Sequence, residues 1–343
     1  MSDRPEIDPT LEAWVRGLPK AEVHVHLEGC IPAEVVRRSA LAAGVQPRDE
    51  FEFSDLASFL AHLDWSCALV TEADDLHQIA YEQCRRASES GVLYADVIVN
   101  PTHWPSWSDR LDDFIDALDR GFADAEADGY ARAGLCPSIK RNQSASQAVE
   151  LVEWLLHTNH PRVVGLSIDG NEVADPLSGA RFAEAFRLAA DKGMRRAVHA
   201  GESSGPEGVR DALAHLQPER IDHGVRSVED PSLILELADR GIALDVCPTS
   251  NVLLGVAGSY AEHPVEEFRK AGVRFSLNTD DPLLFGTNVC NEYCTCATTF
   301  GWGGDDLEQA ARVSIESSFC DVHLRQALLA QLDSYVRANP FPG

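Results

Sequence analysis

The fold is best predicted from the stretch Ala21-Glu22-Val23-His24-Val25-His26-Leu27-Glu28-Gly29. Valine and histidine alternate in it, which is typical of a β-strand. Residues two apart point to the same side of a strand, so His24 and His26 would aim two imidazole rings into one space. Two imidazoles on one strand can hold Zn²⁺ or a similar ion from one side. A strand with two polar residues facing solvent is the alternative that this stretch alone leaves open.

Short apolar runs and amphipathic segments alternate through the rest of the 343 residues. Eight strands are expected, at 21–26, 92–99, 133–139, 163–169, 195–200, 220–225, 242–247 and 273–279. The alternation predicts a (β/α)8 TIM barrel, one domain over residues 1–343, with a helical insertion at about 45–90 after the first strand and a C-terminal helical tail at about 305–338. A doubly wound open sheet is the alternative, but no G-x-G-x-x-G motif follows the first strand.

The composition argues against several classes of protein. Acidic residues outnumber basic ones by 55 to 29, for a formal charge of −26, which opposes binding to nucleic acid. No apolar run approaches the roughly 18 residues that a membrane span needs, and the acidic N-terminus does not resemble a secretory signal. Nine scattered cysteines suggest a reducing compartment, so we expect a cytoplasmic protein. The sequence does not indicate an oligomeric state.

Polar and ionisable residues lie where the apolar strands should end. In a barrel of this type the C-terminal strand ends and the following loops form the active site. The residues at these positions are His24 and His26, Asp169-Gly170-Asn171-Glu172, His199 and Glu202, Asp222-His223, Asp245, and Asn278-Thr279-Asp280-Asp281. Agreement among six strand ends favours a functional site over isolated buried polar groups. Cys290, Cys294 and Cys296 are a second, weaker metal candidate, because their spacing is not that of a zinc ribbon.

The residue types suggest separate roles. A catalytic zinc ion needs three or four nitrogen and oxygen ligands and an open position for water. His24, His26 and His199 offer nitrogen and Asp280 offers oxygen. Glu202, three residues after His199, would be a general acid or base. His223 would orient the water or take its proton, while Asp281 would point away from Asp280 and hold substrate.

Taken together, these residues resemble the adenosine deaminase family of the amidohydrolase superfamily. The matching motifs occur in family order over residues 18–286. They are Leu18-Pro19-Lys20-Ala21-Glu22-Val23-His24-Val25-His26-Leu27-Glu28-Gly29, Val198-His199-Ala200-Gly201-Glu202, Asp222-His223-Gly224, Cys247-Pro248-Thr249-Ser250-Asn251 and Ser276-Leu277-Asn278-Thr279-Asp280-Asp281-Pro282.

The resemblance implies one zinc ion per chain, held by His24, His26, His199 and Asp280. It also implies that Glu202 protonates N1 of a 6-aminopurine while hydroxide adds to C6. His223 would activate and position the hydroxide, and Asp280 would be a catalytic residue as well as a ligand. The implied substrate contacts are Asp281 to N7, the Gly170 N–H to N3, and His26 and Glu28 at the pocket wall. The expected reaction is zinc-dependent hydrolytic deamination of a 6-aminopurine nucleoside, adenosine or a derivative, to the 6-oxopurine and ammonia.

Two departures from the family pattern bear on the substrate. Position 28 is Glu, where adenosine-specific members usually carry Asp, and the segment 97–104 lacks an Arg that many relatives have. Glu at this position is similar to the adenine deaminase and aminodeoxyfutalosine deaminase branches. These substrates are therefore alternatives, as is, more remotely, a non-purine amide. Residues of the loop and insertion either line the N9 side of the pocket or pack the core; they are Trp65, His103, Trp104 and Trp107.

Overall fold

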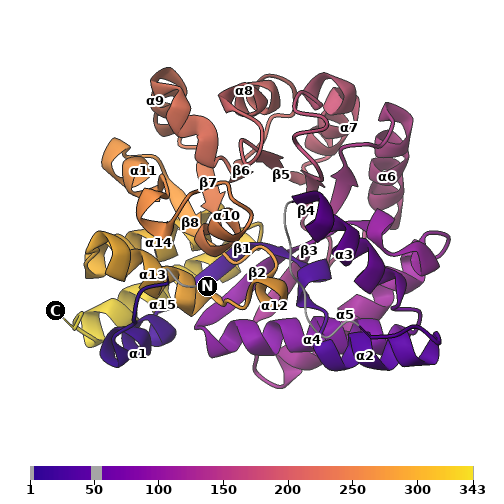
Figure 1. The fold of residues 1–343 in the computed structure, drawn as a ribbon, viewed down its shortest axis with the longest axis horizontal. Coiled ribbons are helices and arrows are strands. Elements are labelled where there is room, and N and C mark those ends of the chain that lie inside the picture. Colours follow the sequence, from indigo (N-terminus) through magenta and orange to yellow (C-terminus); the bar gives the residue numbers. More distant parts are fainter. Residues whose placement is uncertain (1–3, 48–55, 343) are drawn as a thin grey trace.

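The computed structural model describes residues 4–47 and 56–342. Its central feature is a sheet of eight parallel strands that follow one another in chain order (Figure 1). The strands are β1 (Lys20–His26), β2 (Val92–Val99), β3 (Arg132–Lys140), β4 (Gly165–Asp169), β5 (Arg195–Ala200), β6 (Arg220–His223), β7 (Ala243–Val246) and β8 (Phe275–Leu277). Each overlaps its expected range, and the predicted (β/α)8 barrel is confirmed.

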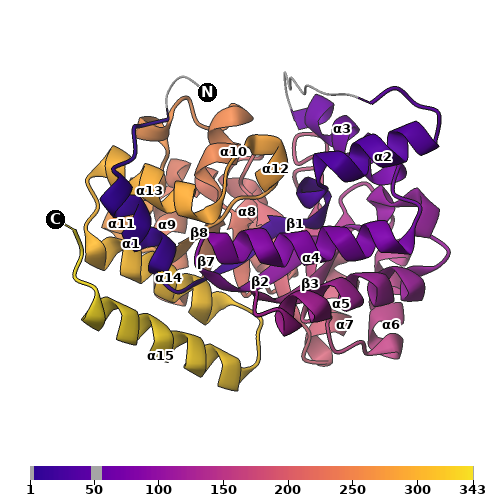
Figure 2. The ribbon, with the colours of Figure 1, turned by 90° about the horizontal axis from the view of Figure 1, so that it is seen from below.

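Helices surround this sheet and close its two ends. Those outside the C-terminal tail are α1 (Pro9–Gly17), α2 (Ala33–Ala42), α3 (Leu56–Ala68), α4 (Ala73–Glu89), α5 (Leu111–Ala127), α6 (Ala145–Thr158), α7 (Gly179–Asp191), α8 (Pro206–His215), α9 (Pro231–Arg240), α10 (Pro248–Leu253), α11 (Val265–Ala271), α12 (Pro282–Phe285) and α13 (Val289–Phe300). The tail consists of α14 (Gly304–Ser317) and α15 (Val322–Ala338). Figure 2 shows α3, α10 and α12 on one side of the barrel strands and α15 on the opposite side.

The chain has additional helices after the first strand and at its C-terminal end. Helices α2, α3 and α4 separate β1 from β2, and the part of the predicted insertion at residues 48–55 lies outside the described residues. Within the described residues, no helix has the length and apolar character needed to cross a membrane.

The barrel closes through a bridge between Val25 of β1 and Asp280, three residues after the end of β8. The Asp280 carbonyl accepts a hydrogen bond from the His26 N–H (2.8 Å), and the Asp280 N–H donates to the His24 carbonyl (3.1 Å). Below this bridge the Asn278 side-chain oxygen accepts from the N–H groups of Val23 (2.8 Å) and His24 (3.2 Å). The Asn278 side-chain amide thus takes the place of backbone hydrogen bonds between the two strands. Backbone contacts hold Asp280 beside both histidines.

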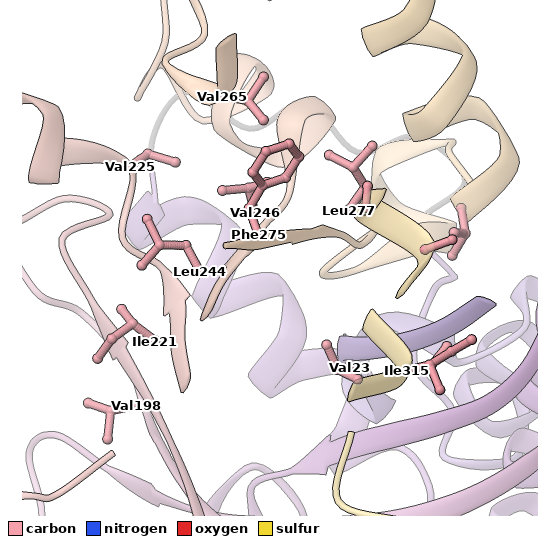
Figure 3. Close-up of a cluster of buried hydrophobic side chains, with 14 of the residues drawn as sticks. Val23, Val198, Ile221, Val225, Leu244, Val246, Val265, Phe275, Leu277 and Ile315 are labelled. Atoms are coloured by element: carbon pink, nitrogen blue, oxygen red, sulfur yellow. The ribbon is translucent and has the colours of Figure 1, made fainter. Parts of the chain in front are cut away.

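Strand residues alternate between an apolar outer layer and a polar interior. Val198, Ile221 and Leu244 belong to one buried cluster with Val265 of α11 and Ile315 of α14 (Figure 3). The residues that follow them in β5, β6 and β7 are the buried polar groups His199, Asp222 and Asp245. The period-two pattern of a strand therefore packs the outside of the barrel and supplies ionisable groups to its inside.

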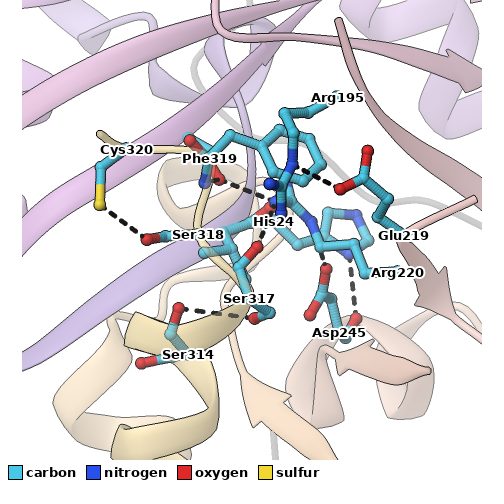
Figure 4. Close-up of polar contacts among 12 residues, drawn as sticks. His24, Arg195, Glu219, Arg220, Asp245, Ser314, Ser317, Ser318, Phe319 and Cys320 are labelled. Atoms are coloured by element: carbon cyan, nitrogen blue, oxygen red, sulfur yellow. Dashed lines mark hydrogen bonds and ion pairs between the residues drawn. The ribbon is translucent and has the colours of Figure 1, made fainter. Parts of the chain in front are cut away.

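A buried arginine neutralises the acidic interior on the side facing the C-terminal tail. Arg220 is fully buried, and its guanidinium lies 2.8 Å from an Asp96 oxygen and 2.7 Å from an Asp245 oxygen. Figure 4 shows the contact between Arg220 and Asp245. It also donates to the Val23 carbonyl (2.9 Å). The Phe319 ring, between α14 and α15, covers it with the guanidinium carbon 3.7 Å from the ring centroid. The tail thus seals a charge network that joins β1, β2, β6 and β7.

Replacing Arg220 by Met should lower the free energy of unfolding by about 3–5 kcal/mol, because two buried carboxylates lose their partner. Urea denaturation followed by circular dichroism measures this change. The control is Arg187→Ala, which removes an exposed pair with Asp191 and should cost less than about 1 kcal/mol. Equal stability of the two variants would mean that the Arg220 network does not hold the barrel together.

Candidate active site

Four predicted metal ligands come together at the C-terminal ends of the strands. His24 and His26 extend from β1, His199 from β5, and Asp280 from the bridge that closes the barrel. Asp280 Oδ1 lies 3.5 Å from His24 Nε2 and 3.4 Å from His26 Nε2. His26 Nε2 lies 3.0 Å from His199 Nε2. Residues separated by more than 250 positions in the chain therefore converge on one small space.

His223 of β6 adds a further imidazole to this cluster. Nitrogen and oxygen atoms of His24, His199, His223 and Asp280 all lie within 4.8 Å of one another. The geometry therefore allows either His26 or His223 as the third nitrogen ligand beside His24, His199 and Asp280. Distance alone does not decide between the two sets.

Contacts with oxygen atoms on the far side of two rings indicate which nitrogen faces the cluster with a lone pair. His24 Nδ1 lies 3.0 Å from the Asp245 carbonyl oxygen, which only accepts, so Nδ1 carries the hydrogen. His199 Nδ1 lies 3.1 Å from an Asp222 oxygen. Their Nε2 atoms are left with lone pairs, and the buried His24 Nε2 has no hydrogen-bond partner. Unpaired nitrogen lone pairs crowded beside a carboxylate fit a bound divalent cation, and such orienting contacts are usual behind metal-binding histidines.

Two residues of the cluster have an unfavourable backbone conformation. Asp280 has φ +64° and His223 has φ +62°, in the left-handed region that non-glycine residues rarely adopt. This conformation costs about 1–3 kcal/mol per residue, and it concentrates at functional sites. The Ser250 hydroxyl of α10 fixes the Asp280 carboxylate by donating a 2.6 Å hydrogen bond to Oδ2.

Glu202 lies beside the cluster, and its surroundings favour the protonated carboxyl group. Its carboxyl oxygen is 3.6 Å from His223 Nε2, and the side chain is buried at the pocket. Burial, reinforced by the charges of Asp280 and Glu172, raises the pKa of Glu202 to about 8. At neutral pH the free site therefore favours a protonated Glu202, which can act as a proton donor.

The loop that carries Glu202 is held by a residue to which sequence reasoning assigned no role. Glu172 Oε2 accepts from the backbone N–H groups of Glu202 (2.9 Å), Ser203 (2.8 Å) and Ser204 (2.9 Å). Its other oxygen lies 3.2 Å from Arg141 Nη2. Glu172 had one sequence signal, its place after the fourth strand, whereas nothing in the sequence pointed to Arg141.

Asp281 and Gly170 line the same pocket, as expected for substrate contacts. Asp281 is buried, Oδ1 has no hydrogen-bond partner, and burial next to the Asp280 charge raises its pKa well above the usual value. A protonated Asp281 can donate a hydrogen bond to an acceptor nitrogen. Its place depends on Gly29, where a Cβ would lie 2.2 Å from Asp281 Oδ1.

Glu28 forms another wall of the pocket and has one unused oxygen. Its Oε1 accepts from the Asn100 N–H (2.8 Å) and from Trp104 Nε1 (2.8 Å), while the buried Oε2 has no partner. Trp104 itself is fully buried against Phe114. Trp104 therefore packs the core and orients Glu28.

The pocket encloses about 480 Å³, open solvent at its mouth included. Its apolar wall consists of Phe59, Leu60 and Leu63 from α3 together with Leu254 after α10. Of the four residues proposed for the N9 side, His103 lines the pocket, whereas Trp65, Trp104 and Trp107 are not among its lining residues. Such a cavity, apolar on one side and ionisable at its floor, suits a flat polar heterocycle.

Comparison with known proteins agrees with this arrangement. The Adenosine deaminase family model matches residues 19–335. An adenine deaminase of Sinorhizobium fredii is 35% identical over 320 residues, which cover 92% of this chain and 98% of that protein.

Two solved structures extend the similarity to the fold. The adenine deaminase from Arthrobacter aurescens is 29% identical with a TM-score of 0.87, covering 93% of this chain and 99% of its own. An amidohydrolase from Burkholderia ambifaria, solved with bound Zn, is 30% identical with a TM-score of 0.86, covering 97% of this chain and 96% of its own. With the family model matching nearly the whole barrel, the chain belongs to the adenosine deaminase family and is a hydrolytic deaminase that acts on the C–N bond of a cyclic amidine.

Proposed function

We propose that this chain is a zinc-dependent adenine deaminase, which converts adenine and water to the 6-oxopurine and ammonia. The observation that carries the proposal is the convergence of imidazole nitrogens, among them the unpaired His24 Nε2, and the Asp280 carboxylate next to the buried Glu202. One zinc ion per chain would be held by His24, His26, His199 and Asp280. When bound, zinc lowers the pKa of a water molecule to about 7 and so supplies an oxygen nucleophile at neutral pH.

Other pocket residues would protonate the purine ring and bind its nitrogen atoms. Glu202, protonated at neutral pH, donates its proton to N1 of the purine, which makes C6 more electrophilic. Asp281, also protonated, donates a hydrogen bond to N7, and the Gly170 N–H donates to N3. These contacts stabilise charge that grows on the ring as it loses aromaticity, so they act mainly in the transition state. Glu202, now a carboxylate, would then take the proton of the oxygen added to C6 and pass it to the amino group, so that C6 becomes a carbonyl and ammonia leaves.

Free adenine is favoured over a nucleoside by Glu28. Adenine carries an N9–H donor where a nucleoside carries a sugar, and the unpaired Glu28 Oε2 is a buried acceptor in the same pocket. Leaving that oxygen without a partner would cost about 1–3 kcal/mol. The relatives described above as adenine deaminases support the same choice. The nucleoside expected first from the sequence is thus the less supported substrate.

Removing the metal should abolish deamination, and Zn²⁺ should restore it. We expect about one zinc ion per chain by elemental analysis, and His24→Ala should reduce the occupancy well below one because it deletes a ligand. His215→Ala, an exposed histidine on α8, is the matched control and should keep full occupancy. Full activity of the metal-free protein would contradict the proposal.

Glu202→Gln should lower kcat about 10²- to 10⁴-fold, since the amide has no proton to transfer to N1. Zinc content should not change, because Glu202 is not a proposed ligand. Glu207→Gln, an exposed change in the same region, should leave kcat intact. A Glu202→Gln enzyme of normal kcat would show that another group protonates the ring.

A substrate panel followed by ammonia release should show higher kcat/KM for adenine than for 9-methyladenine, adenosine or aminodeoxyfutalosine. Glu28→Gln should lower kcat/KM for adenine by about 10- to 100-fold, because its amide donor faces N9–H. The same change should leave 9-methyladenine unaffected. Preference for a nucleoside would refute the assignment of adenine, and no turnover of any purine would refute deamination itself.

A further inference from the structure

His223 faces the metal cluster, but its role depends on which of its ring nitrogens carries the hydrogen. Its Nε2 is close enough to the other ligand atoms to bind an ion. A nitrogen that carries hydrogen cannot ligate a metal, whereas it can donate to a water molecule. The contacts on the far side of the ring therefore decide between the two roles.

The chain of contacts begins at a backbone amide of α11. The Val265 N–H donates to His263 Nδ1 at 3.2 Å, so Nδ1 acts as an acceptor. Burial lowers the pKa of His263 to about 3, which keeps the ring neutral with its one hydrogen on Nε2. This Nε2 lies 3.0 Å from Asn251 Oδ1 and donates to it. A backbone donor that cannot reverse thus fixes the direction of the next hydrogen bond.

The orientation of the Asn251 amide in turn determines which His223 nitrogen accepts a hydrogen bond. Because its oxygen accepts from His263, its amide nitrogen faces His223 Nδ1, at 3.3 Å. An amide nitrogen only donates, so His223 Nδ1 accepts. A ring whose Nδ1 accepts a hydrogen bond is neutral and carries its one hydrogen on Nε2. That Nε2 points toward two carboxyl oxygens, of Glu202 at 3.6 Å and of Asp280 at 3.9 Å.

We propose that His263 and Asn251 are positioning residues that hold His223 as the Nε2–H tautomer. His24 and His199 have the opposite arrangement, because an acceptor oxygen faces each Nδ1 and leaves Nε2 free to ligate. We call the chain of hydrogen bonds from the Val265 N–H through His263 and Asn251 to His223 the relay. It removes His223 from the ligand set and leaves His26 as the third nitrogen ligand. In the reaction, which rests on the proposed function, His223 orients the attacking oxygen by donating to it and does not act as its base.

The direct test is ¹⁵N NMR of the zinc-loaded protein with labelled histidines, which needs no turnover. The His223 signal is assigned by its loss in His223→Gln. We expect the shift of a protonated nitrogen for Nε2 and of an unprotonated nitrogen for Nδ1. The reverse pattern, or a metal-bound shift at Nε2, would overturn the proposal.

Variants test whether the relay causes this state. Asn251→Asp offers only acceptors, so it should move the hydrogen of His223 to Nδ1 and lower kcat about 10²-fold or more, with a smaller change in KM. Asn339→Asp adds the same charge at an exposed position and should change neither. His263→Gln keeps a donor for Asn251 and should preserve the tautomer, whereas His263→Leu should not.

These outcomes separate the relay from the proposed reaction. If Asn251→Asp does not fold, the two His263 variants and the wild-type spectrum still decide the question. A tautomer unchanged in Asn251→Asp or in His263→Leu would overturn the relay. Protonated Nε2 in a protein that deaminates no purine would refute the reaction alone, and adenine turnover with hydrogen on Nδ1 would refute the relay alone.

Discussion

The closure of the barrel at Asp280 is the constraint on which the rest of the structure depends. Its backbone completes the ladder between the last strand and β1, and the same residue presents its carboxylate to His24 and His26. The contacts that close the ring of strands therefore also bring the proposed ligands together. The left-handed backbone of Asp280 is tolerated because its N–H, its carbonyl and its carboxylate are each held by a hydrogen bond.

Charge is the second constraint, because the interior of the barrel is strongly acidic. On the side of the C-terminal tail, Arg220 compensates Asp96 and Asp245. On the pocket side, burial raises the pKa values of Glu202 and Asp281 and so favours their uncharged, protonated forms. A charged carboxylate would be costly to bury there, and the protonated forms can donate hydrogen bonds. Asp280 keeps its charge among imidazoles, where it can bind a divalent cation. Burial therefore both creates the need for a cation and prepares the acids that act on the substrate.

Much of the fold follows from the sequence, since each strand shows a local apolar pattern and each ligand lies at a strand end. The predicted ligands His24, His26, His199 and Asp280 are brought together, although their assignment as ligands stays a prediction. Sequence reasoning gave no role to Arg141 and Glu172, which hold the Glu202 loop, because their contacts join distant segments with no periodic signal. The relay through His263 was missed for the same reason. The sequence also did not show that Trp104 orients Glu28, because that role depends on a hydrogen bond between distant residues.

The most direct test of the central claim is anomalous X-ray diffraction at the zinc edge on crystals of the zinc-loaded protein. The account predicts a single strong peak at the C-terminal ends of the strands, about 2.0–2.2 Å from ligand atoms of His24, His26, His199 and Asp280. His223 should lie outside the coordination sphere. A peak elsewhere, or an ion at this site without Asp280 as a ligand, would contradict the account.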